Sequence, residues 1–410
     1  MPEGAKPHLP HGAWAFAVTQ ATAGLAHGLV FVLVMSLLAE IPRRYISLAL
    51  PALGVAVGMG LALVVSLLLR SRQDRWRWHR TAAGAWAVAA GALAIVAALF
   101  ATGALSPAMG AVLAANLVPV LIALWAVVHT CRTVATPALG SVAAAVGGEN
   151  AAATTRVVGL GRTATQAGNL IGFGLASALL LLHVPALGFL VAGCGAVVVV
   201  ALALVLGSFV PRATAPPKSK AHVHASWRGL PWPLCTAAGF AGIALGGAWN
   251  AVAPSLAHPP AAFGGLEIAE ALAAIGGGAV LAGGLPRLGT WPLLLLAAVL
   301  LVPALHPSVL QSFPVAMALF ALAGATSTAA LGSLSTRYRL AVRLENRASA
   351  MAAYSALAQA TGLAGAGAVA SVGGVGSIGP ALTGMAALLV LAVLVAQVNP
   401  ASPALPQAPA

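Results

Sequence analysis

Long apolar stretches, separated by short polar segments, follow one another along almost the whole chain. A helix needs about 20 mainly apolar residues to cross a bilayer. The stretches that meet this need are residues 13–38, 46–69, 82–104, 108–130, 157–182, 185–209, 231–254, 263–283, 289–305, 311–334, 348–370 and 377–397. The pattern therefore predicts an all-α membrane protein with about twelve transmembrane helices.

The longest polar segment in the middle of the chain is Pro-rich and basic, and it separates six predicted spans from six. A segment of this composition is typical of a flexible linker. The predicted organisation is a cytoplasmic tail (1–12), a six-helix bundle (13–210), a cytoplasmic linker (211–230), a second six-helix bundle (231–398) and a C-terminal tail (399–410). No segment outside the spans is long enough for a soluble catalytic or nucleotide-binding domain.

Composition agrees with this pattern. Of 410 residues, 60% are apolar and only 7% are charged, whereas soluble domains are about 25% charged. The net charge of +13 does not indicate a nucleic-acid partner, because the basic residues stand in short connections between apolar spans. The partners expected there are membrane lipids. Cys131, Cys194 and Cys235 form no CxxC pair and are expected to be small apolar residues.

The distribution of basic residues predicts the orientation. If both termini are cytoplasmic, the connections on that side, including a loop at 131–156 that holds Arg132, contain 18 of the 20 lysines and arginines. Only Arg43 and Arg44 fall on the other side. Basic residues favour the cytoplasmic side. The protein is therefore expected to have an even number of spans. Its expected location is a cell membrane, such as the inner membrane of a bacterium.

The two halves contain a repeated pattern. Residues 166–174 (QAGNLIGFG) and 359–367 (QATGLAGAG) share Q-A-x-x-L-x-G-x-G. Glu-Asn pairs precede both spans, at 149–150 and 345–346. The repeat joins the fifth span to the eleventh, which run in the same direction. Parallel repeats of this kind are typical of transporters whose substrate site lies between the halves.

The loop after the second span, RSRQDRWRWHR (70–80), carries a further signature. Asp74, Arg75 and Arg80 match three positions of the motif found between spans two and three of the major facilitator superfamily, which the whole chain resembles. The resemblance implies a secondary transporter working by alternating access, monomeric and without a cofactor. It makes these three residues candidates for a cytoplasmic gate. A carboxylate at Asp74 can accept hydrogen bonds from the start of the eleventh span, or it is a solvated loop residue.

The fifth span is similar to that of the superfamily's drug- and siderophore-exporting branch. Gly168 and Gly172 keep the spacing of the exporter motif, and Phe173 stands where that motif has proline. This resemblance implies efflux of a small, amphipathic molecule. An uncoupled facilitator and an uptake carrier of the same fold remain alternatives.

Polar residues inside the spans are the candidates for a substrate cavity, because an unpaired polar group in hydrocarbon is costly. Each of them either lines a cavity or forms a hydrogen bond between helices; the second interpretation is favoured for the three that stand alone, Asn116, Asn250 and Gln359. The candidates are Gln20, His27, Asn116, Gln166, Asn169, Asn250 and Gln359.

Glu267 and Glu270, one helical turn apart near the outer end of the eighth span, are the only acids expected within the membrane. Two adjacent carboxylates in a poorly hydrated site do not both ionise readily. They are therefore, with His27, the candidates for coupling transport to a proton. Glu270, the deeper of the two, is the expected carrier and Glu267 its modulator. The alternative is that both acids reach water at a helix start.

Other chemistries find no support in the sequence. The chain has lysine only at Lys6, Lys218 and Lys220, none of them after glycine, so no P-loop for ATP is present. It contains no H-E-x-x-H and no Cys/His cluster of metal-binding spacing. A membrane enzyme using His27 or His129 as a base would need a positioned nucleophile, for which the sequence shows no pattern. We therefore predict a transporter of a small molecule and not an enzyme.

Overall fold

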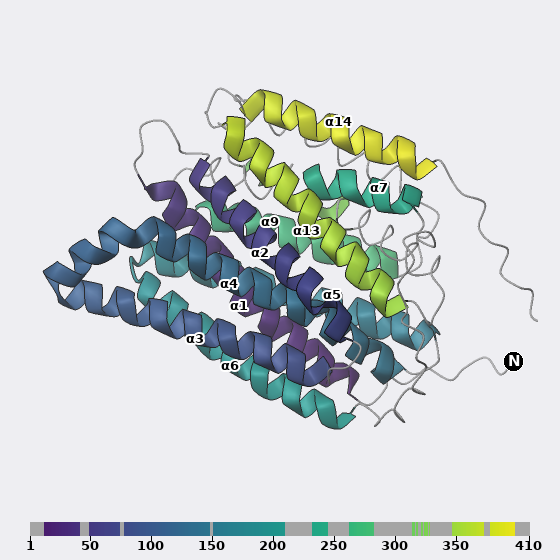
Figure 1. Ribbon diagram of the computed structural model, residues 1–410, viewed down its shortest axis with the longest axis horizontal. Helices are drawn as coiled ribbons and strands as arrows, with labels where there is room; N and C mark the ends of the chain where they lie inside the picture. The colour runs from purple at the N-terminus through teal and green to yellow at the C-terminus, as the bar shows by residue number, and fades with distance from the viewer. Residues whose placement is uncertain are drawn as a thin grey trace, which may run out of the picture.

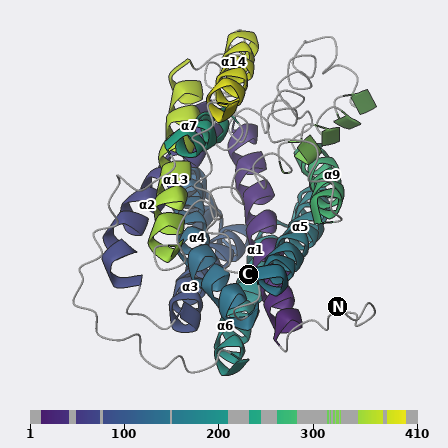
Figure 2. The same ribbon diagram turned by 90° about the vertical axis from the view of Figure 1, so that its right-hand side faces the viewer.

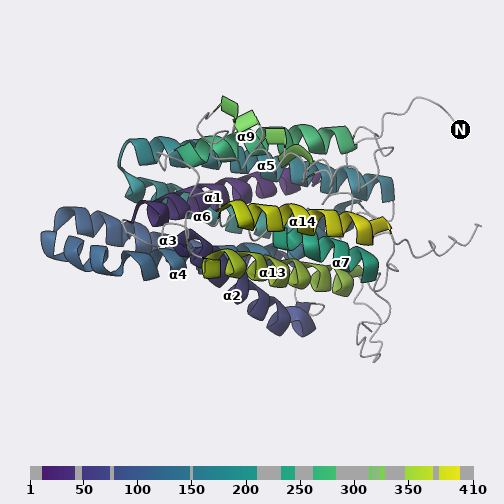
Figure 3. The same ribbon diagram turned by 90° about the horizontal axis from the view of Figure 1, so that it is seen from above.

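The structure is a computed structural model. It describes residues 12–41, 49–73, 78–147, 151–209, 232–244, 262–282, 347–372 and 378–397, with parts of 314–328. Helices make up nearly all of these residues, and no strand occurs among them. The helices run roughly alongside one another in one elongated bundle (Figures 1 and 3).

Six helices come from the first half of the chain: α1 (Ala13–Glu40), α2 (Ala49–Gln73), α3 (Trp78–Leu105), α4 (Pro107–Gly147), α5 (Ala151–Leu181) and α6 (Pro185–Phe209). The second half contributes α7 (Trp232–Ala241), α9 (Ala262–Ala282), α13 (Arg347–Val372) and α14 (Ile378–Gln397). These two sets are called the first-half and second-half helices below.

All six first-half helices contain a segment long and apolar enough to cross a bilayer, by length and composition. Large apolar side chains on their outer faces are exposed, such as Val88 and Ile95 on α3 and Val197 on α6. Water would make such a surface costly, whereas lipid solvates it. By contrast, α1 is buried along most of its length at the centre of the molecule. The chain is therefore an all-α membrane protein, as its sequence predicts.

The predicted spans agree with the described helices to within a few residues in most cases, but the predicted loop at 131–156 is wrong. There α4 continues to Gly147 and α5 begins at Ala151. The stretch is rich in alanine, the best helix former, and the hydroxyls of Thr133 and Thr136 bond to carbonyls one turn back, at 2.9 and 2.8 Å. Its polar residues lower the hydropathy without ending the helix. The predicted span 289–305, the linker 211–230 and both tails, apart from Gly12, lie outside the described residues.

Glycines allow α1 and α5 to pack backbone against backbone. A Cβ added to Gly168 would meet the carbonyl oxygen of Ala21, and one added to Gly172 would meet that of Leu25. On the facing helix, a Cβ added to Gly24 would meet the carbonyl of Thr165. Small residues four positions apart permit such close approach in membrane helices. The two glycines that resemble an exporter motif therefore have a packing role here.

Two seams join the first-half helices to the second-half helices. Along these seams α5 lies beside α9, and α2 lies beside α13 (Figure 2). The nearest atoms there belong to side chains: the Met59 thioether faces Gly362, and the Ser177 side chain faces Gly264. The Phe173 carbonyl oxygen also lies 3.1 Å from a Cβ added to Gly264.

Candidate functional site

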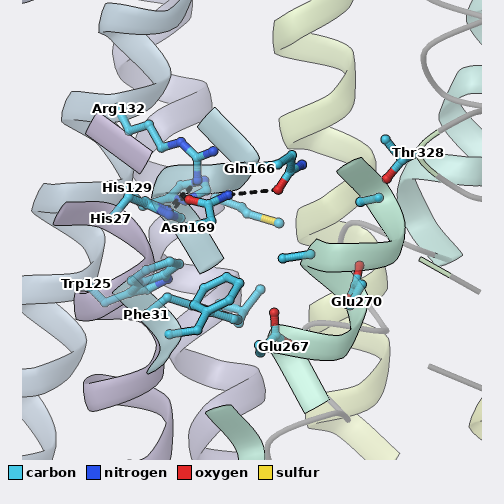
Figure 4. Close-up of a pocket in the computed structure, with 15 residues that line it drawn as sticks. His27, Phe31, Trp125, His129, Arg132, Gln166, Asn169, Glu267, Glu270 and Thr328 are labelled. Carbon is cyan, nitrogen blue, oxygen red and sulfur yellow. Dashed lines mark hydrogen bonds between the residues drawn. The ribbon is translucent and has the colours of Figure 1, made fainter. Parts of the chain in front are cut away.

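A cavity of about 260 Å³ lies between the two sets of helices (Figure 4). It is near the middle of α1, far from the ends of that helix. Residues of α1, α2, α4 and α5 line it from the first half, and residues of α9 with Thr328 line it from the second. The lining residues are His27, Phe31, Val55, Met59, Trp125, His129, Arg132, Gln166, Asn169, Phe173, Glu267, Glu270, Ala271, Ala274 and Thr328.

One wall of the cavity carries a cation and two histidines. Arg132 Nη1 donates to the ring of His27, lying 3.0 Å from Nε2 and close to Nδ1 as well. A guanidinium has only donors, so the ring nitrogen that takes this bond is unprotonated. Further N–H groups of Arg132 remain for another partner. The guanidinium pairs with none of the three acids that the structure describes, Glu40, Glu267 and Glu270.

His129 links the two halves of the chain. It lies 3.1 Å from the side chain of Gln359 on α13, through its Nε2 and the amide oxygen Oε1. Because that oxygen can only accept, Nε2 donates and Nδ1 is the free acceptor of the ring. Gln359 and Gln166 hold equivalent positions in the sequence repeat, and both lie at this site, one bonded to a lining residue and one lining the cavity directly.

Aromatic rings form the apolar part of the cavity. Phe31 and Trp125 have ring centroids 5.2 Å apart, and His27 is also 5.2 Å from Trp125. Phe31 meets Phe263 of α9 edge-on at 5.6 Å. Such contacts favour offset or edge-to-face geometry, and Phe31 and Trp125 both line the cavity.

The opposite wall carries the acids. Glu267 is buried, with 6% of its surface exposed, and Glu270 follows one turn later on α9, half-buried and packed against Gly324. In Figure 4 both carboxylates lie across the cavity from Arg132. On α5, between the two walls, Asn169 donates through Nδ2 to Gln166 Oε1 at 3.1 Å.

Several buried polar atoms of the cavity have no hydrogen-bond partner in the protein. They are Trp125 Nε1, His129 Nδ1, Asn169 Oδ1 and Glu267 Oε1. Buried polar groups are nearly always paired, because leaving one unpaired costs about 1–3 kcal/mol. Four such atoms in one cavity therefore indicate a site for a polar occupant, either water or a ligand.

Five of the sequence candidates come together here: His27, Gln166, Asn169, Glu267 and Glu270. The acids do not simply reach water at a helix start, since Glu267 is buried in the cavity wall.

Other candidates lie elsewhere. Gln20 is outside the cavity and accepts a hydrogen bond at 3.3 Å from the Thr165 hydroxyl, between α1 and α5. Asn116 lies on the exposed face of α4 and does not line the cavity. The hydrogen bond between helices that was expected of it is not seen among the described residues, and its amide instead donates within α4 to the Val112 carbonyl at 2.9 Å. Arg80 is exposed near the start of α3. Asp74, Arg75 and Asn250 lie outside the described residues.

The cavity candidates from the sequence did not include Trp125, His129 or Arg132, and His129 was considered only as a base for a membrane enzyme. Arg132 was expected in a cytoplasmic loop, whereas the structure places it in the cavity wall, because α4 continues past it. The three residues follow an i, i+4, i+7 spacing, which puts them on one helical face. This spacing would have indicated a shared polar face if the fourth span had been predicted to continue beyond residue 130.

The sequence matches no family model and no curated protein. Solved structures do resemble the chain. A bacterial homologue of the human lysosomal transporter Spinster, inward-facing and occupied, is 14% identical with a TM-score of 0.60, over 94% of this chain and 94% of that chain. A bacterial homologue of the iron transporter ferroportin, outward-facing, is 14% identical with a TM-score of 0.68, over 94% of this chain and 98% of that one.

The chain has the major facilitator fold. Both neighbours are transporters of that fold, and each likeness spans nearly the whole of both chains. The fold expected from the spans, the repeat and the loop signature is thus confirmed. In this fold the cavity lies at the interface between the two halves, where secondary transporters bind their substrates.

Proposed function

We propose that the chain is a secondary transporter that exports a small, amphipathic molecule in exchange for a proton. One observation carries the proposal: a polar cavity with unpartnered atoms lies between the two halves of a major facilitator fold. In such folds the halves rock about a central site and expose it to one side at a time. The mixture of aromatic and charged lining residues suits an amphipathic substrate.

Proton coupling is supported by the surroundings of Glu267. The groups that face it are Glu270 on its own helix, His27 from α1, and His129 and Arg132 from α4; the described lining of α5 contributes no titratable group. A buried carboxylate with an unpartnered oxygen can hold a proton in one conformation and release it in another.

We assign the role of carrier to Glu267 and that of modulator to Glu270, the reverse of the expectation from sequence depth. Glu267 is the more buried of the two, and its Oε1 is unpartnered. His27 is less suited, because it already accepts a hydrogen bond from a cation. The direction of transport rests on the resemblance of the fifth span to exporters, and the cytoplasmic gate at Asp74, Arg75 and Arg80 remains part of the proposal.

Reconstitution into proteoliposomes tests the function. We expect some member of a panel of small amphipathic molecules to be moved uphill when an inward proton gradient is imposed, and only downhill without it. Downhill movement that ignores the gradient would make the protein an uncoupled facilitator. An absence of transport for every member, in protein shown to be folded and inserted, would remove the transporter proposal.

A further inference from the structure

The charged groups of the cavity are separated by sign. The first-half wall holds Arg132 beside His27 and His129, and the second-half wall holds Glu267 and Glu270 (Figure 4). Arg132 and Glu267 do not pair with each other across the cavity. A charge in a poorly hydrated site needs a counter-charge or a full set of hydrogen bonds. A ligand with a single charge satisfies one wall and leaves the other unpaired.

The unpartnered atoms specify the groups that the ligand must bring. Glu267 Oε1 on the acidic wall can accept a hydrogen bond, so it requires a donor such as an ammonium group, which has N–H bonds and no acceptor. On the other wall, the remaining N–H groups of Arg132 form a planar fork that matches a carboxylate. Phe31 and Trp125, whose ring centroids lie 5.2 Å apart, form the apolar part of the same lining.

The size of the cavity limits the ligand. Pockets for drug-sized molecules enclose about 300–1,000 Å³, and this cavity of about 260 Å³ is smaller. It therefore suits a compact molecule with few rotatable bonds rather than a long-chain lipid.

We propose that the substrate is a small aromatic zwitterion of the amino-acid type. Its carboxylate binds Arg132, its ammonium group binds Glu267, and its ring packs on Phe31 and Trp125. The inference rests on the proposed function in that it takes the cavity as the transported substrate's site. It also supplies a physical reason for exchange: the ammonium group and a proton compete for the same carboxylate, so the arrival of one releases the other to solvent.

Equilibrium binding to the purified, detergent-solubilised protein at neutral pH tests the proposal. The probes are L-phenylalanine, phenethylamine, which lacks the carboxylate, and 3-phenylpropionate, which lacks the amine. We expect L-phenylalanine to bind at least about tenfold more tightly than either analogue, because a hydrogen bond to a charged group is worth about one such factor or more.

Two variants assign the charges to their walls. Arg132→Gln should remove the advantage of L-phenylalanine over phenethylamine, and Glu267→Gln should remove its advantage over 3-phenylpropionate. Arg132→Lys should retain part of the first advantage, since it keeps the charge without the fork. Glu40→Gln, at the exposed end of α1, is the matched control and should leave all three affinities unchanged.

The proposal is overturned if either analogue binds the wild-type protein as tightly as L-phenylalanine, or if none of the three binds. Because binding needs neither a gradient nor turnover, its outcome is distinct from that of the transport assay. Selective binding without transport would retain the site and contradict the proposed function. Transport of singly charged molecules, with no selective binding of L-phenylalanine, would retain the proposed function and contradict the zwitterion site.

Discussion

Two kinds of helix contact meet at the cavity, and they differ in how easily the contacting atoms can move. Along the α1–α5 contact, glycines place backbone on backbone: Gly168 faces the Ala21 carbonyl. Along the α2–α13 seam between the halves, glycines face movable side chains. Gly362 faces the Met59 thioether, and a Cβ added to Gly60 would lie 3.8 Å from the Leu363 methyl groups. A backbone cannot yield without moving a helix, whereas a side chain changes rotamer.

This difference separates the fixed part of the cavity from the part that can move. His27 and Asn169 stand on opposite sides of the α1–α5 contact, so their relative position is set by close-packed backbone. Glu267 stands across the α5–α9 seam. A rocking motion of one half against the other therefore moves the acidic wall relative to a constant basic wall.

The largest expected effect comes from locking the α5–α9 seam. A Cβ added to Gly264 lies 3.0 Å from the Ser177 Cβ, close to the distance of about 3.5–4.5 Å that a disulfide spans. In a background without the native cysteines, oxidation of Ser177→Cys/Gly264→Cys should reduce transport to background, and a reductant should restore it.

The matched control is a disulfide within the first half. A Cβ added to Gly195 of α6 lies 3.4 Å from the Ala26 Cβ of α1. Oxidised Ala26→Cys/Gly195→Cys should continue to transport, because these helices are expected to move together. If the first disulfide leaves transport intact, the α5–α9 seam does not open.

A smaller effect, on stability, is expected from the α1–α5 contact. Gly168→Ala should lower the free energy of unfolding by about 2–3 kcal/mol, because the added methyl group meets a carbonyl oxygen and the helices must separate. Thermal unfolding in detergent measures it. Gly159→Ala on the same helix, where an added Cβ meets nothing within 4 Å, is the control and should not destabilise.

The same substitution on the seam between the halves should cost less. An added Cβ at Gly362 meets the end of the Met59 side chain, and methionine adapts readily. We expect Gly362→Ala to lower the free energy of unfolding by less than about 1 kcal/mol. A loss equal to that of Gly168→Ala in the same assay would mean that the two contacts do not differ.

The smallest effect is expected from the bond between His129 and Gln359. A hydrogen bond of this kind contributes about 0.5–1.5 kcal/mol net, and this one joins the halves in the arrangement seen here. Gln359→Leu should therefore slow the oxidation of the Ser177→Cys/Gly264→Cys pair by about two- to tenfold. Asn116→Leu, which removes a bond confined to one helix, should leave that rate unchanged.

The sequence was sufficient for the fold because burial in a bilayer leaves a strong apolar signal for each span. It did not predict the length of α4, because a helix that continues beyond the apolar layer keeps its backbone hydrogen bonds while its side chains become more polar. This is why Arg132 was expected in a loop.

The cavity residues were only partly predictable. Polarity inside a span identified His27, Asn169 and Glu267, because such residues are costly without a role. It could not distinguish them from Gln20 and Asn116, since the direction in which a polar side chain points depends on how its helix is rotated against its neighbours. That rotation is set by contacts between residues distant in sequence, such as Gly168 with Ala21.

The most direct test of the account is the behaviour of Glu267→Gln in proteoliposomes, with Glu270→Gln and Glu40→Gln measured beside it. With a substrate found by the transport panel, we predict that Glu267→Gln abolishes uphill transport driven by a proton gradient and keeps downhill exchange at saturating substrate, with a weaker apparent affinity. Glu270→Gln should shift the pH dependence of uphill transport without abolishing it, and Glu40→Gln should resemble the wild type. Continued uphill accumulation by Glu267→Gln would contradict the central claim that the proton is carried by this carboxylate in the cavity between the halves.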